Sequence, residues 1–64
     1  MPAPHNKRQA LERERGELQG RIATYQRELD TTLPAQKARR ERLEWQIRRD
    51  QKRVAEIEAR LAGG

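Results

Sequence analysis

The chain has 64 residues, of which 33% are hydrophobic and 39% are charged, with a formal net charge of +5 and no Cys. These values exclude a broad hydrophobic core, a disulfide framework and a thiolate metal site. The composition is typical of long helices and coiled coils, and the positive charge favours anionic partners. No stretch approaches about 18 consecutive apolar residues and no hydrophobic segment opens the sequence, so we expect no membrane span, no secretory peptide and a cytoplasmic location.

Residues 1–6 are expected to form a flexible N-terminal arm, because two prolines fall within them, and Asn6 is a candidate N-cap. The first predicted helix spans residues 7–31. Its apolar side chains recur at intervals of three, four or seven residues, which predicts a narrow coiled-coil seam. The residues of this seam are Leu11, Leu18, Ile22, Tyr25 and Leu29.

Pro34 interrupts the helical pattern, because it lacks an N–H donor and pushes Leu33 out of the α conformation. Two adjacent Thr residues before it weaken the first helix further and are candidates to cap the next one. The predicted turn is therefore residues 32–33. Pro34 is expected in the first turn of a second helix over residues 34–62, with 63–64 as a tail. The alternative is one continuous helix that is kinked at Pro34.

The second helix has an apolar seam of its own, formed by Leu43, Ile47, Val54, Ile57 and Leu61. A chain folded between Thr32 and Leu33 brings together residues equidistant from that point, for example Leu18 and Ile47. Every a position of one helix then meets a d position of the other, as an antiparallel coiled coil requires. We therefore predict an all-α fold, an antiparallel two-helix coiled-coil hairpin over residues 7–62 that dimerises or docks on a partner.

Polar residues in the seam support the same register. Arg15 is predicted to face Asp50 as a charge pair that fixes the register, and Arg40 is predicted to stack on Tyr25. Two flanking charge pairs are also expected to be attractive, namely Glu14 with Arg53 and Glu28 with Arg39. Exposed pairs of this kind contribute only ~0.2–1 kcal/mol each, so they select the register more than they stabilise it.

The outward faces of the two helices are the candidate binding surfaces. The first helix presents a strip of small residues where another helix could approach closely, or which is simply a solvated face, and this strip comprises Gly16, Gly20, Ala23 and Arg27. The second helix presents cations around an outward Trp, a residue type common at interface anchors. This nucleic-acid or partner surface comprises Arg39, Arg42, Trp45, Arg48, Arg49 and Lys52.

The stretch Lys37-Ala38-Arg39-Arg40-Glu41-Arg42-Leu43-Glu44-Trp45 resembles the arginine-rich helices of phage N-type antitermination peptides. That resemblance implies binding of an RNA hairpin, with Arg on phosphates and Trp stacked on the loop. The stretch departs from those peptides because Leu43 belongs to the seam and two Glu interrupt the charge. In size and hairpin form the chain also resembles Rop-type plasmid RNA-binding proteins, although it shares no motif with them.

Catalysis needs converging functional groups, and none is visible in the sequence. His5 is the only His, and Asp30 is the only acid at the turn, which is too few for a Mg²⁺ site. We therefore expect no enzyme activity, no catalytic or metal site, no cofactor and no small-molecule substrate.

The predicted function is binding to another protein or to a second copy, as in small accessory or regulatory proteins of phages and plasmids. The alternative is an RNA- or DNA-binding regulator.

Overall fold

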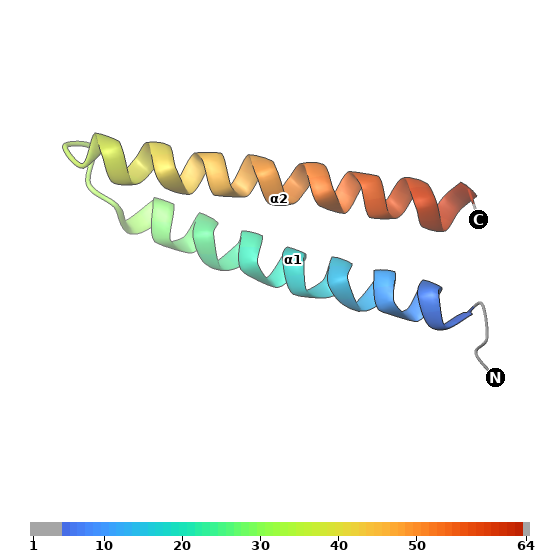
Figure 1. The fold of residues 1–64 in the computed structure, drawn as a ribbon. Helices are drawn as coiled ribbons and strands as arrows, with labels where there is room; N and C mark the ends of the chain where they lie inside the picture. The colour runs from blue at the N-terminus through green and yellow to red at the C-terminus, as the bar shows by residue number, and fades with distance from the viewer. Residues whose placement is uncertain (1–4, 64) are drawn as a thin grey trace.

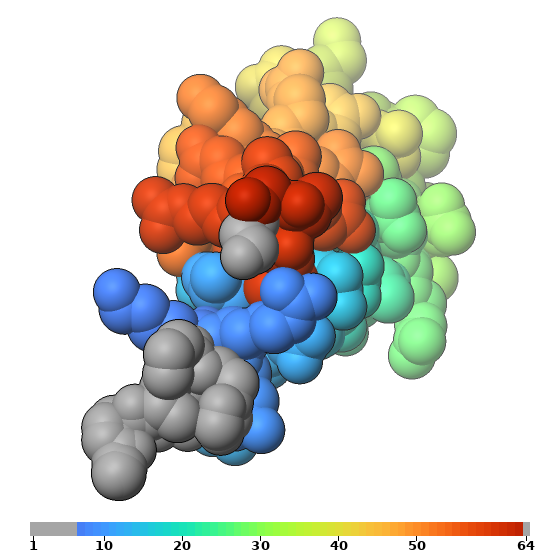
Figure 2. Space-filling view, turned by 90° about the vertical axis from the view of Figure 1, so that its right-hand side faces the viewer, coloured from blue at the N-terminus to red at the C-terminus, as the bar shows by residue number. Residues whose placement is uncertain are grey.

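The computed structural model describes residues 5–63 and contains two α-helices, α1 (His5–Thr31) and α2 (Lys37–Gly63), which run antiparallel (Figure 1). The Cα atoms extend over 53 × 16 × 13 Å, so the molecule is a rod. Viewed along the rod from its open end, α2 lies directly on α1 (Figure 2). The predicted all-α helical hairpin is confirmed, and the alternative of one continuous helix is wrong.

Both helices differ from the predicted boundaries. Helix α1 begins at His5 instead of residue 7, so Asn6 lies inside the helix and is not its N-cap. Helix α2 begins at Lys37 instead of Pro34 and continues through Gly63. The connection therefore occupies residues 32–36 rather than 32–33. Most of the predicted N-terminal arm lies outside the described residues.

A hydrogen-bonded turn explains the late start of α2. The Leu33 N–H donates to the Gln36 side-chain oxygen Oε1 (3.1 Å), and the Gln36 N–H donates back to the Leu33 carbonyl (2.9 Å). The Gln36 carbonyl then accepts the first helical bond of α2, from the Arg40 N–H at 3.0 Å. Pro34 occupies the second position of this turn, which its fixed φ favours. The turn uses Pro34 itself, so the helix starts three residues later than predicted.

The two Thr residues at the turn cap the end of α1 and not the start of α2. The Oγ1 hydroxyls of Thr31 and Thr32 donate to the Glu28 carbonyl at 3.0 and 2.7 Å. The Thr32 N–H donates to the Leu29 carbonyl at 3.1 Å, and the Thr32 carbonyl accepts from the Arg40 guanidinium at 3.2 Å. Two carbonyls in the last turn of α1, those of Glu28 and Leu29, are thus satisfied locally.

The core is the predicted seam between the helices. Leu18, Val54 and Ile57 form one buried cluster, and Ile57 is 0% exposed. Three partly buried side chains pack against this cluster, Leu11, Ile22 and Leu61, while Leu43 and Ile47 are buried nearer the turn. The heptad pattern therefore identified the correct face of each helix.

The register along this seam is wrong in the sequence prediction. Leu18 was expected to face Ile47, but it packs with Val54 and Ile57, about one heptad further along α2. A shift by a heptad leaves the same residues in the seam and changes the partners that they face within it. The longer turn permits this shift. It also places Ile57 and Leu61 against apolar residues of α1, whereas the predicted register would leave Ile57 opposite Arg8.

Candidate interaction surface

Asp50 lies in the seam and is 2% exposed, and its partner is Arg21. The Arg21 Nη2 donates to both carboxylate oxygens of Asp50, at 3.1 and 3.2 Å. The Arg49 Nε lies 3.8 Å from the same carboxylate. The prediction of an Arg15–Asp50 pair is wrong because of the register shift. Sequence reasoning missed Arg21, although its position next to the seam residue Ile22 places it within reach of the facing helix.

The other predicted pairs have mixed outcomes. Arg53 binds Glu14 with two hydrogen bonds, Nε to Oε2 at 2.9 Å and Nη2 to Oε1 at 3.0 Å, as predicted. Hydrogen bonding from Arg53 lowers the pKa of Glu14, and the same bond raises the pKa of Arg53. The predicted stacking of Arg40 on Tyr25 is wrong, because the Arg40 guanidinium instead binds the Thr32 carbonyl at the turn.

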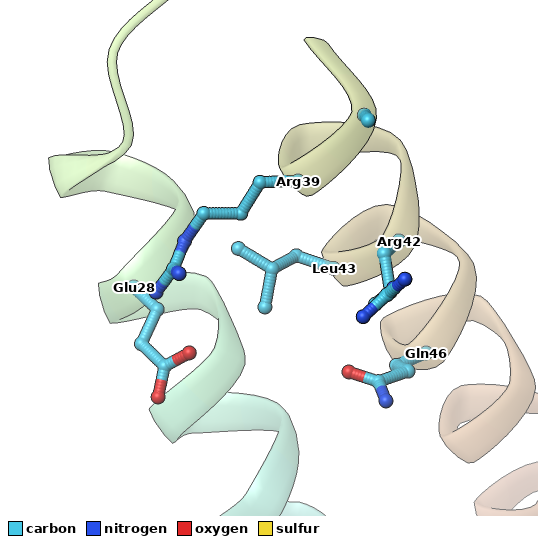
Figure 3. Close-up of a pocket in the computed structure, with 6 residues that line it drawn as sticks. Glu28, Arg39, Arg42, Leu43 and Gln46 are labelled. Atoms are coloured by element: carbon cyan, nitrogen blue, oxygen red, sulfur yellow. The ribbon is translucent and has the colours of Figure 1, made fainter. Parts of the chain in front are cut away.

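Arg39 lies on a different side of α2 from Trp45 and Arg48, and Arg42 lies between them. Arg39 extends toward α1 across Leu43, with Glu28 on the facing helix, in a groove on the side of the hairpin (Figure 3). The groove is also lined by Ala38, Arg42 and Gln46. Glu28 and Arg39 both line this groove. The ion pair predicted between them is not among the pairs within 4.0 Å that the described residues form. Arg39 therefore belongs to the junction between the helices.

The remaining predicted residues gather on the outward side of α2. Trp45 is 54% exposed, and the guanidinium carbon of Arg49 lies 4.9 Å from its ring centroid, which is a cation–π contact. A shallow groove beside the indole is lined by Ala38, Glu41, Arg42, Trp45, Gln46 and Arg48. Lys52 is exposed two turns beyond Trp45 on the same side of the helix. We call Arg42, Trp45, Arg48, Arg49 and Lys52 the Trp45 face.

Most cations of the Trp45 face are not neutralised within the hairpin. Among the described residues, the arginines in ion pairs within 4.0 Å are Arg8, Arg21, Arg49 and Arg53. Of these, only Arg49 belongs to the Trp45 face. Arg42, Arg48 and Lys52 take part in none of these pairs. Their charges are therefore free to attract an anionic group from outside the chain.

The small-residue strip of α1 faces outward, as predicted. A Cβ atom added at Gly16 or at Gly20 would meet nothing within 4 Å. Ala23 and Arg27 are also exposed. Packing within the hairpin thus does not require glycine at either position.

The residues described by the structure contain no cluster of three or more His, Cys, Asp or Glu side chains suited to a metal ion. Neither described helix is long and apolar enough to cross a membrane. No protein-family model, curated protein sequence or solved structure matches the chain. A functional proposal for this helical hairpin therefore depends on its own surface.

Proposed function

We propose that the hairpin is a non-catalytic protein-binding module, an accessory or regulatory protein of the cytoplasm, and that the Trp45 face is its contact surface. The exposure of Trp45 carries this proposal. An indole that is 54% exposed on a rigid helix offers a large apolar contact area, and Trp is enriched among the residues that dominate binding energy at interfaces. The Arg49 guanidinium stacks on this ring and adds a cation to the contact surface.

The thin core supports the same proposal. Within residues 5–63 the buried hydrophobic side chains are Leu18, Leu43, Ile47, Val54 and Ile57. Domains of this length bury only about 60% of the surface that the unfolded chain exposes, so their stability is marginal. A partner that binds only the folded hairpin stabilises it by mass action.

The proposal is tested by position-specific photo-cross-linking in the native host. A photoreactive residue replaces Trp45 in one variant and Gln19, an exposed residue of α1, in the control. We expect protein adducts from position 45 that survive nuclease treatment, and few from position 19. Equal labelling from both positions, or no protein adduct from position 45, would refute the Trp45 face as a protein-binding surface.

Nucleic-acid binding is the second candidate, favoured by the unpaired cations Arg42, Arg48 and Lys52 around an exposed aromatic ring. Affinity for RNA or DNA would then fall steeply with salt, with a logarithmic slope of about −0.7 to −0.9 per phosphate contacted. The double substitution Arg42→Glu with Arg49→Glu would abolish retention on nucleic acid. Unchanged retention in that variant would eliminate this candidate.

A further inference from the structure

The outward side of α2 carries a second row of positions at intervals of seven residues, separate from the buried seam. This central row consists of Ala38, Trp45, Lys52 and Ala59, which are all exposed. Seven residues make almost two helical turns, so the row runs nearly parallel to the helix axis. At 1.5 Å per residue it is roughly 32 Å long. A straight row of this length fits another helix lying along α2.

Size and shape along the row favour such a neighbour. The small side chains of Ala38 and Ala59 at the two ends allow a second helix to approach the backbone of α2 closely. Trp45 then projects between them as a single large apolar residue next to the shallow groove. One aromatic anchor, in a row whose other long side chain is Lys52, is a typical centre for an interface.

Charged residues flank the central row on both sides, in the places where helix pairs select their partners. One flank carries Arg42 and Arg49, and the other carries Arg48. Because Arg42 and Arg48 have no ion pair among the described residues, a helix with acidic flanks would complement them. Glu41 and Glu56 lie on the same flanks, and this mixture of signs suits a protein better than a continuous phosphate backbone.

A second copy of the chain is a poorer complement than an acidic helix. The outward strip of α1 carries Arg13, Arg27 and the two glycines, and the exposed acids of this helix lie beside the strip, at Glu12, Glu17 and Asp30. The Trp45 face is itself basic, and the whole chain has a net charge of +5. The net positive charge therefore opposes the pairing of two copies and favours a more acidic partner.

We propose that the Trp45 face binds an acidic amphipathic helix of another protein, which lies along the row from Ala38 to Ala59 and packs an apolar side chain against Trp45. This inference rests on the proposed function and specifies the partner's chemistry. Carboxylates on the partner helix pair with Arg42 and Arg49 on one flank and with Arg48 on the other. The hairpin becomes two helices of a three-helix assembly.

The chain contains a single Trp, so Trp45 fluorescence reports contact at this face directly. The probe is a synthetic four-heptad helix with Leu at its seam positions and Glu at its flanks, and the comparison peptide carries Lys in place of Glu. We expect a saturable blue shift of the Trp45 emission with the Glu peptide alone. The variant with Arg42→Glu and Arg48→Glu should bind the Glu peptide about tenfold more weakly or worse, because two attractive contacts become repulsive.

The matched control is Arg13→Glu with Arg27→Glu, which changes the net charge equally on the outward side of α1 and should leave the affinity unchanged. Circular dichroism establishes that both variants remain helical. The inference is overturned by equal binding of the Lys peptide, by tighter binding of an oligouridylate or a short DNA duplex than of the Glu peptide, or by a blue shift that tracks self-association. Protein adducts from position 45 without Glu-peptide binding would refute the acidic helix and leave the proposed function standing.

Discussion

The pair between Arg21 and Asp50 gives the sharpest test of the register. Asp50 is 2% exposed, and its two carboxylate oxygens accept hydrogen bonds from Arg21 at 3.1 and 3.2 Å. The substitution Arg21→Met removes these bonds while keeping an unbranched apolar stem against the helix surface. A buried carboxylate then loses its main partner, which is destabilising. Arg15→Met is the control, because Arg15 would be the partner in the register read from the sequence.

The expected magnitude follows from the geometry. Hydrogen bonds to charged groups contribute about 1.5–3 kcal/mol to stability. Water reaches the half-exposed Arg21 side chain, so we expect this pair to contribute about 1–2 kcal/mol. A domain of this size has a total stability of roughly 3–10 kcal/mol, so the loss is a large fraction. The melting temperature should fall by roughly 5–15 °C. Arg15→Met should change the free energy of unfolding by less than about 0.5 kcal/mol.

Urea and thermal unfolding followed by circular dichroism measure both effects. A double-mutant cycle of Arg21→Met with Asp50→Asn should give a coupling free energy of about 1 kcal/mol, whereas Arg15→Met with Asp50→Asn should give almost none. If Arg15 were the residue coupled to Asp50, the register described above would be refuted. The predicted register, one heptad away, would then be correct.

Three further predictions concern the core, the small-residue strip and acid stability. Ile57→Ala should cost about 2–5 kcal/mol, because the side chain is 0% exposed, and a helical signal that persists with an unchanged melting temperature would contradict the described core. Gly16→Ala with Gly20→Ala should raise stability by about 1–2 kcal/mol in thermal melts, since the new methyl groups meet nothing within 4 Å; a loss would show that the strip is packed. Because Arg53 lowers the pKa of Glu14, their bond should stabilise the fold above the unfolded carboxyl value of about 4.3 and stop doing so as the pH falls through the lowered folded value. The stability difference between the native chain and Arg53→Gln should therefore vanish in acid, and a difference that persisted there would argue against the pair.

The heptad pattern predicted the parts of the structure that depend on local sequence. Spacings of three, four and seven identify the buried face, because only those positions share one side of a helix. Asp50 was correctly expected in the seam and Trp45 on the outside. Glu14 and Arg53 were correctly paired, since long flanking side chains tolerate a change in register.

The register could not be predicted from the same pattern. A seam that repeats every seven residues stays apolar when one helix slides along the other by seven residues. The turn decides between the alternatives, and its length depends on contacts that the pattern does not contain. Gln36 closes the turn with its side chain, and Thr32 caps α1 and receives the Arg40 guanidinium. These bonds moved the start of α2 by three residues, in the direction that brings Asp50 toward Arg21.

The sequence assigned Arg39 both to the basic surface and to a pair with Glu28, and the structure places it nearer to the second assignment. It belongs to the basic stretch of the sequence, but the helix turns it toward Leu43 and Glu28 at the junction with α1. A residue in a run of charges can therefore lie on any face of the helix. Its position around the helix axis determines which face it occupies. The Trp45 face is therefore the predicted surface without Arg39, and its residues lie along one side of α2.

The most direct test of the hairpin and its register is disulfide formation between introduced cysteines. The native chain has no Cys, so a pair with Leu18→Cys and Val54→Cys contains the only two thiols. Leu18 and Val54 share one cluster, and we expect rapid formation of a bond within a single chain. The pair with Leu18→Cys and Ile47→Cys should stay reduced, because seven residues displace position 47 by roughly 10 Å along α2. Oxidation of the second pair in preference to the first, or only cross-links between chains, would contradict the account.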